Sequence, residues 1–262
     1  MSARREVVGR AGELLRLHRA PELLTVVNVW DVVSAKVVAG TEGTLALATA
    51  SHSIAASRGY EDGENIPVDE MLAEVARIVA ATDLPVSADL EAGYGDAADT
   101  VRRAIGVGVV GANLEDQMKP LDEAVRVVEQ VMEAARAEGV DDFVLNARTD
   151  AFVLGKDRDR GEVLADAVER GRAFLEAGAP VVFVPGALTE DEVSTLVDAL
   201  GPQRLTLIGL PGVPPLRRLE ELGVARVSYG PLSQRVALTA LQELVEDVHR
   251  GGGVPDSVRP LN

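Results

Sequence analysis

The sequence contains no cysteine, so a disulfide framework, a thiolate metal site and a cysteine nucleophile are all excluded. Aromatic residues are also scarce, and Trp30 is the single tryptophan. A lone tryptophan packs into a core more often than it forms a stacking platform. Core packing and substrate contact therefore both stay open for Trp30.

Positive charge is in deficit. The chain has 26 Lys and Arg against 42 Asp and Glu, a formal net charge of -16. Nucleic acids and anionic lipid surfaces are bound by clustered basic residues, so this balance argues against a nucleic-acid or membrane partner. Charged residues interrupt positions 1–20, and no later segment approaches the apolar length of a membrane span. We expect a soluble, cytoplasmic protein.

What the sequence does have is a regular alternation of strand and helix patterns. Residues 6–18 predict a leading helix that ends near Pro21 and covers one end of the core, and residues 57–66 predict a polar loop. Strands are expected at 23–30, 45–50, 85–93, 111–116, 142–151, 181–186, 204–212 and 226–231. Helices are expected after them at 31–40, 68–81, from Asp96 as N-cap, 122–138, 161–177, 191–200, 216–222 and 233–249.

Near-continuous runs of Val, Leu, Ile and Ala are typical of parallel strands that helices cover on both faces. Eight strand–helix units in 262 residues predict a closed (β/α)8 TIM barrel, with residues 1–262 forming one domain. A doubly wound open sheet is the alternative, but it usually has fewer units and a topological switch point. The GxGxxG match at 106–111 does not indicate dinucleotide binding, because it follows a helix and precedes a strand.

In a parallel barrel the carboxyl ends of all strands lie on one face, and that face carries the active site. Polar residues stand at the ends of the first five predicted strands, with Asp62 in the loop beyond the second. They are Asn28, Trp30, Asp31, Thr49, Ser51, His52, Asp62, Asp89, Glu91, Asn113, Glu115, Asp116, Asn146, Arg148 and Asp150.

Asp89 and Glu91 form the most informative pair among these residues. They are two positions apart, so in a strand both carboxylates point to the same face, and Gly93 and Gly95 then predict a turn. This pattern indicates a metal site, and the alternative is a solvated strand end before an ordinary turn. Oxygen ligands without His or Cys suit Mg²⁺, which keeps several waters and often shares its coordination shell with the substrate.

Arg148 is the one arginine in the set. Its planar guanidinium can bind a carboxylate or phosphonate in bidentate fashion, and a structural ion pair with a neighbouring glutamate is an equally good interpretation. Ser51 fits either a substrate contact or a small residue at a strand end. His52 fits either a substrate contact or a position directed into the helical layer.

Four segments in this order resemble the phosphoenolpyruvate mutase and isocitrate lyase superfamily: GYEDGE at 59–64, ADLEAGYG at 88–95, NLEDQ at 113–117 and NARTDA at 146–151. The resemblance extends from about residue 24 to residue 250. It implies Mg²⁺, with Mn²⁺ as the alternative, held mostly through water by acids that match Asp62, Asp89, Glu91 and Glu115. Asp89 is the expected direct ligand.

The resemblance also implies an α-oxo acid whose oxygens lie near Ser51 and Arg148. The expected catalytic residues are Asp62, Glu115 and Arg148. The expected substrate-binding residues are Trp30, Asp31, Ser51, His52, Asn113 and Arg148.

Members of the superfamily make or break a C–C or P–C bond next to a Mg²⁺-stabilised enolate of pyruvate type. This chain lacks the K-[KR]-C-G-H loop of the isocitrate and methylisocitrate lyases, and Lys119, Tyr94 and Tyr229 are the candidates for the missing acid. We expect a Mg²⁺-dependent C–C lyase of a small 2-oxo or hydroxy carboxylic acid, with decarboxylation of a β-oxo acid as one form. The alternatives are a phosphonomutase or P–C hydrolase of the phosphonopyruvate or carboxyphosphonoenolpyruvate type, and a non-catalytic metabolite-binding barrel.

The resemblance and the last helix, which ends in three glycines, also predict how the chain assembles. We expect a homodimer or homotetramer in which that helix is exchanged between subunits.

Overall fold

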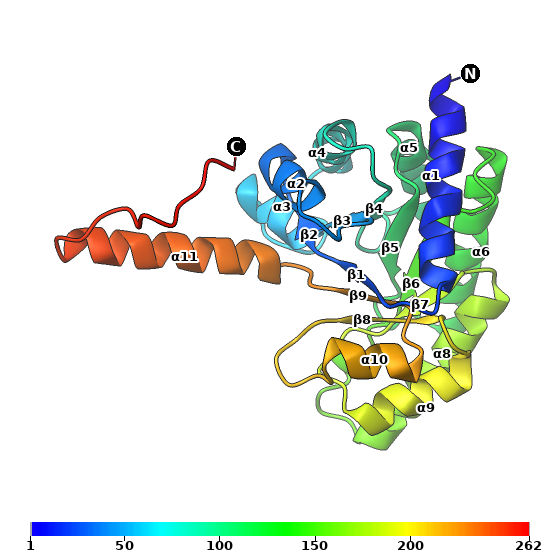
Figure 1. Ribbon diagram of the computed structural model, residues 1–262. Coiled ribbons are helices and arrows are strands. Elements are labelled where there is room, and N and C mark those ends of the chain that lie inside the picture. The colour runs from blue at the N-terminus through cyan, green and yellow to red at the C-terminus, as the bar shows by residue number, and fades with distance from the viewer. Residues whose placement is uncertain (1, 262) are drawn as a thin grey trace.

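The computed structural model describes residues 2–261 as a ring of parallel strands surrounded by helices (Figure 1). The strands are β1 (Leu24–Val26), β2 (Asn28–Val29), β3 (Leu47–Thr49), β4 (Val86–Asp89), β5 (Gly111–Glu115), β6 (Val144–Arg148), β7 (Val181–Phe183), β8 (Leu205–Ile208) and β9 (Arg226–Ser228). The helices are α1 (Ser2–Arg19), α2 (Val32–Ala39), α3 (Ser51–Ser57), α4 (Val68–Ala80), α5 (Ala97–Gly106), α6 (Leu121–Ala137), α7 (Ala151–Leu154), α8 (Arg160–Glu176), α9 (Glu190–Leu200), α10 (Leu216–Leu222) and α11 (Leu232–His249).

The sheet closes into a barrel through its first strand. All pairings are parallel, in the order β1-β9-β8-β7-β6-β5-β4-β3-β2. Only Val27 separates β1, which pairs with β9, from β2, which pairs with β3. The two outer strands of the sheet are thus one continuous stretch of chain. The predicted (β/α)8 barrel is confirmed and the open-sheet alternative is wrong.

The helix predictions after α1 agree with the structure to within one residue at each end. Asp96 caps α5 as predicted, since its carboxylate accepts the backbone N–H of Asp99 at 2.9 Å. The strands are shorter than predicted, and the short helices α3 and α7 begin directly after β3 and β6. Within residues 2–261, no helix has both the length and the apolar character needed to cross a membrane.

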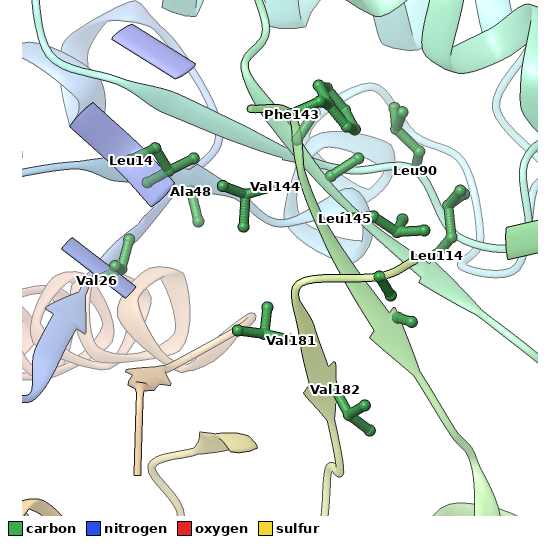
Figure 2. Packing of buried hydrophobic residues seen from close by; sticks show 14 of the residues in the cluster. Leu14, Val26, Ala48, Leu90, Leu114, Phe143, Val144, Leu145, Val181 and Val182 are labelled. Atoms are coloured by element: carbon green, nitrogen blue, oxygen red, sulfur yellow. The ribbon is translucent and has the colours of Figure 1, made fainter. Parts of the chain in front are cut away.

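Helix α1 covers the amino-terminal end of the barrel, as predicted for the leading helix. Leu14 of α1 lies beside Val144 and Ala48 in the barrel interior (Figure 2). A Cβ atom at Gly111 would lie 2.8 Å from the carbonyl oxygen of Val144 and 2.9 Å from Leu14. Glycine at the start of β5 therefore provides the space that α1 fills.

Above this apolar layer the barrel interior is polar. Asn146 Nδ2 donates to Asn113 Oδ1 at 2.7 Å, and the Thr206 hydroxyl donates to Asn146 Oδ1 at 2.6 Å. These three side chains come from β5, β6 and β8 and are buried. Because buried polar groups must be hydrogen-bonded, this chain of bonds fixes the relative height of the strands below the barrel mouth.

His18, on the last turn of α1, is fully buried, and its Nδ1–H donates to the Leu14 carbonyl oxygen at 2.8 Å. Burial lowers the pKa of His18 from 6.5 to about 3, and the positive charge of Arg226 contributes to the decrease. The folded protein therefore keeps His18 neutral, while the unfolded chain binds a proton below about pH 6.5. Folding stability must fall as the pH decreases from 6.5 towards 3.

We expect the substitution His18→Asn to reduce this acid sensitivity. The slope of unfolding free energy against pH should decrease by up to about 1.4 kcal/mol per pH unit between about pH 6 and pH 4, in urea titrations. His249→Asn, in the last turn of α11, is the matched control and should keep the wild-type slope. Equal slopes in His18→Asn and the wild type would contradict the assignment.

Candidate functional site

The first half of the site joins α3 to the end of β4. Ser51 donates to Asp89 Oδ2 from both its backbone N–H, at 3.2 Å, and its hydroxyl, at 2.8 Å. The Thr49 hydroxyl oxygen accepts the backbone N–H of Asp89 at 3.0 Å. One oxygen of Asp89 is thus held in a fixed orientation at the barrel mouth, the end of the barrel where the carboxyl ends of the strands lie.

The prediction that Ser51 and His52 end the second strand is wrong. The strand stops at Thr49, Ala50 is the N-cap of α3, and both residues lie in the first turn of that helix. His52 is half-buried, and its Nδ1 atom is buried without a hydrogen-bond partner among residues 2–261. A substrate contact for His52 stays a prediction.

Glu91 lies beyond β4, in a left-handed turn with φ of 52°. The prediction that strand alternation aligns it with Asp89 is therefore wrong. Its carboxylate accepts the backbone N–H of Glu64 and, at 3.0 Å, the hydroxyl of Tyr94, while the Glu64 carboxylate accepts the backbone N–H of Tyr94. These bonds connect the β4–α5 connection to the loop at 58–67, which also carries the exposed Asp62.

Glu91 is buried, and this changes its ionisation. Burial raises the pKa of Glu91 to about 7. The hydrogen bonds from Tyr94 and Glu64 oppose the increase, while the negative charges of Asp89 and Asp62 add to it. This half of the site therefore contains more negative charge than its hydrogen bonds stabilise.

The second half of the site is an ion-paired group at the ends of β5 and β6. Glu115 and Arg148 are register neighbours, and Arg148 Nη1 lies 2.8 Å from Glu115 Oε2. Arg148 Nε donates to Asp150 Oδ1 at 2.7 Å. The ion-pair interpretation of Arg148 is thus correct, and a substrate contact for the same side chain stays a prediction.

Charges in this half are coupled to the first half. Burial raises the pKa of Glu115 to about 7, with the attraction of Arg148 opposing and the charges of Asp150 and Asp89 adding to the shift. Burial lowers the pKa of Arg148, but the attraction of Asp150, Glu115 and Asp89 outweighs it and raises the value above its ordinary range. Asp89 therefore acts electrostatically across the mouth.

The other predicted substrate-binding residues make structural contacts, and their substrate contacts stay predictions. Asp31 is the N-cap of α2, where its carboxylate accepts the backbone N–H of Ser34 at 2.7 Å. Trp30 packs partly against the core and lines, with Tyr229, an apolar groove between α2 and α11. Asn113 belongs to the hydrogen-bonded chain inside the barrel.

The four predicted metal ligands do not form one ligand sphere. Within residues 2–261, no group of three or more His, Cys, Asp or Glu side chains could hold a metal ion directly. Asp89 is bonded to Ser51, Glu91 to Tyr94, and Glu115 to Arg148. The expected cluster is present as two separate halves.

Several residues of the site carry no site role in the sequence-based predictions. Asp150 follows Arg148 by two positions, the same spacing that selected Glu91 after Asp89, so a signal was present. No sequence signal indicated Arg226, because this residue stands at the start of a short apolar strand. It is fully buried, its Nη1 lies 3.5 Å from the Ser87 hydroxyl, and burial lowers its pKa to about 10, partly opposed by Asp89.

Comparison with known proteins matches most of this chain to one protein family. A family model described as phosphoenolpyruvate phosphomutase matches residues 14–249. The 2-methylisocitrate lyase of Escherichia coli K12 is 32% identical over 221 residues, which cover 78% of this chain and 72% of that protein.

Solved structures agree with this match. A candidate phosphonomutase from Burkholderia cenocepacia J2315 superposes with a TM-score of 0.85 at 40% identity, covering 90% of this chain and 99% of that one. Oxaloacetate acetylhydrolase in complex with the inhibitor 3,3-difluorooxalacetate superposes with a TM-score of 0.84 at 26% identity, covering 97% and 91% of the two chains.

The raised pKa of Glu91 makes a prediction about stability. Between pH 4.5, its ordinary value, and about 7, the folded state holds a proton that the unfolded chain releases. Stability in the metal-free protein should therefore fall as the pH increases through this window. Glu91→Gln keeps a hydrogen-bond acceptor for Tyr94 and should flatten the decrease by up to about 1.4 kcal/mol per pH unit in denaturant titrations.

Glu129→Gln, which removes an exposed carboxylate of α6, is the control. A Glu91→Gln variant that loses stability between pH 5 and 7 as steeply as the control would contradict the prediction.

Proposed function

The chain belongs to the phosphoenolpyruvate mutase and isocitrate lyase superfamily, and from this premise we propose that it is a Mg²⁺-dependent lyase of a small 2-oxo or hydroxy carboxylic acid. The bond broken is a C–C bond, and one of the two fragments is formed as an enolate. The observation that carries the proposal is the arrangement of Arg148, fixed by Glu115 and Asp150, near the carboxylate of Asp89 at the same barrel mouth.

The donor set fits a hard divalent cation. Asp89, Glu91 and Glu115 offer oxygen atoms, and the pKa of about 7 of both glutamates reflects burial and repulsion that a cation would relieve. Because no three acids among residues 2–261 are placed to hold an ion directly, these carboxylates would hold Mg²⁺, or Mn²⁺, mostly through water, with Asp89 as the direct ligand and Asp62 contributing from its loop. When bound, the cation supplies a Lewis acid that stabilises negative charge on the substrate oxygens.

The chain's own residues bind and orient the substrate in this proposal. Arg148 is about one quarter exposed and can donate to a substrate carboxylate while Asp150 fixes its Nε atom. Ser51 orients Asp89, and the Glu64, Glu91 and Tyr94 bonds fix the rim opposite Arg148. Burial and the charge of Glu91 raise the pKa of the Tyr94 hydroxyl, so Tyr94 acts as a hydrogen-bond donor here and is a poor acid at neutral pH.

A binding experiment tests the proposal without turnover. Oxalate, which mimics a pyruvate enolate, should bind the wild type tightly only when Mg²⁺ is present, as measured by calorimetry. Asp89→Ala should weaken Mg²⁺ binding itself, while Arg148→Ala should leave Mg²⁺ binding intact and weaken oxalate by about 2 kcal/mol or more, the energy typical of a charged hydrogen bond. Unchanged affinities in both variants would reject the proposed site.

Turnover separates possible substrates. The short connection between Glu115 and α6 carries neither a cysteine acid nor a long lid, so the leaving fragment should be one that needs little protonation. Oxaloacetate is the first compound to assay, and isocitrate and methylisocitrate should be cleaved negligibly. Isocitrate cleavage near the typical enzyme rate of ~10 s⁻¹ would contradict this specificity.

A second candidate is phosphonomutase or P–C hydrolase activity, because a candidate phosphonomutase shares 40% identity with this chain. Phosphorus NMR of the enzyme with phosphonopyruvate distinguishes the two reactions, since only P–C chemistry moves the phosphorus resonance. Ligand binding without any turnover would instead support a metabolite-binding barrel.

Helix α11 supports a proposal about assembly. It projects away from the barrel (Figure 1), and it exposes an apolar stripe of Leu238, Leu241, Val245 and Val248, spaced three and four residues apart. Only its first turns are anchored to its own barrel, where the Ser233 hydroxyl donates to the Asn28 carbonyl oxygen at 2.7 Å. We infer a homodimer or homotetramer in which α11 packs on the partner subunit.

Light scattering should therefore give a particle mass well above the 27.6 kDa of one chain at micromolar concentration. The double substitution Leu241→Glu and Val245→Glu should shift the particle to the monomer, because it places two charges in the apolar contact. Gln242→Glu, at an exposed polar position of the same helix, is the control and should leave the mass unchanged. A wild-type particle of monomer mass would contradict the inference.

A further inference from the structure

The connection between β5 and α6 is organised around one buried carboxylate, Asp116. Its Oδ1 accepts the backbone N–H groups of Met118, at 3.0 Å, and of Asp150, at 2.9 Å. Its side chain is 2% exposed. A buried carboxylate needs a positive partner as well as hydrogen bonds, and the partner comes from outside the barrel.

That partner is Arg170, on α8 in the outer helical layer. Its Nη1 donates to Asp116 Oδ2 at 3.0 Å, its Nη2 donates to the carbonyl oxygen of Lys119 at 3.0 Å, and its Nε donates to Asp166 Oδ1 at 3.1 Å. The Arg170 side chain is 9% exposed. One guanidinium therefore fixes both the beginning and the end of the connection.

The backbone of the connection requires such a restraint. Gln117 and Met118 both have left-handed conformations, with φ of 49° and 52°. This conformation is unfavourable for side chains other than glycine, and it persists only where the surroundings enforce it. Asp116 and Lys119, the two residues that Arg170 contacts, flank Gln117 and Met118 in the sequence.

The same network reaches Arg148. The backbone N–H of Asp116 donates to the Arg148 carbonyl oxygen at 3.0 Å, and Asp116 Oδ1 holds the backbone N–H of Asp150. The Asp150 carboxylate in turn accepts Arg148 Nε at 2.7 Å. Two hydrogen-bonded groups thus link Arg170 to the guanidinium at the barrel mouth.

We propose that Arg170 is a positioning residue for Arg148, acting through Asp116 and Asp150 to hold the guanidinium in its carboxylate-binding orientation. Arg170 itself lies in the outer layer, and its side chain donates to Asp116, Lys119 and Asp166. The inference rests on the proposed carboxylate-binding role of Arg148. It also assigns the β5–α6 connection the role of a fixed wall of the site, where a mobile lid would need free backbone groups.

The test compares Arg170→Met with Arg172→Met, which removes an exposed arginine of the same helix whose Nε donates only to the Ala199 carbonyl oxygen. Calorimetry measures Mg²⁺ alone and then oxalate in the presence of Mg²⁺. Arg170→Met should weaken oxalate binding by about ten- to hundredfold, the cost of a misplaced binding group, and leave Mg²⁺ binding within about twofold. Arg172→Met should match the wild type in both.

Conservative variants separate positioning from general destabilisation. Lysine keeps the charge beside Asp116 but cannot contact Lys119 and Asp166 at the same time, so Arg170→Lys should recover part of the lost oxalate affinity. Asp166→Asn, which weakens the outer contact of Arg170 together with the ion pair between Asp166 and Arg158, should give a smaller loss in the same direction. These two variants carry the test if Arg170→Met does not fold.

A spectroscopic readout makes the outcome independent of oxalate. The Nε–H resonance of Arg148, assigned by its loss in Arg148→Lys, should exchange slowly with solvent in the wild type and faster in Arg170→Lys. Wild-type exchange of this proton and wild-type oxalate affinity in folded Arg170 variants would overturn the inference. Absence of oxalate binding in the wild type, with the resonance still sensitive to Arg170, would overturn the proposed function and leave the positioning role supported.

Discussion

The structure of the barrel mouth depends on the charge of one guanidinium. Arg148 is paired with Glu115 and Asp150, two carboxylates for one positive charge, while Asp89 and Glu91 nearby are bonded to neutral donors. A buried charge without a partner is costly, and the glutamates respond with pKa values of about 7. Folding alone therefore leaves this region short of positive charge, and either a proton or a cation must complete it.

The backbone conformation around the mouth also reflects the need to hold these charged side chains in place. Of the six non-glycine residues with positive φ among residues 2–261, five lie in the connections that follow β3, β4 and β5. Glu64, Glu91 and Tyr94 stabilise one another through reciprocal side-chain and backbone bonds, and the Asp116 network restrains the other two. Unfavourable conformations of this kind cluster where side chains must be held for a ligand, and here they fix both walls of the site.

Sequence patterns predicted the fold because hydrophobic alternation is a property of each segment by itself. Strand geometry holds for Glu115 and Arg148, which lie within β5 and β6 and are register neighbours. It failed beyond the last strand residue. Glu91 sits in a left-handed turn and Ser51 in a helix, and strand geometry no longer controls side-chain direction at either position.

Other parts of the site are determined by contacts between distant segments, which a single sequence does not reveal. Arg170 is 54 positions from Asp116, and nothing in the pattern of α8 distinguishes it from an arginine on the surface. Asp31 was selected as a strand-end acid, and only the structure shows that it also caps α2 through Ser34. The resemblance to a family identified the acids at the mouth, because the sequence motifs of a family contain residues that folding brings close together.

The two halves of the mouth belong to different strands, and this separation constrains the chemistry. Asp89, Glu91 and Asp62 come from β4 and the loops beside it, while Glu115 and Arg148, the proposed carboxylate clamp, come from β5 and β6. A change in the β5–α6 connection can therefore alter which fragment leaves without disturbing Asp89. In this chain that connection is short and fixed by Asp116 and Arg170, so it cannot fold over a large leaving fragment. For the proposed lyase activity, we therefore expect a small substrate that releases its fragment directly to solvent.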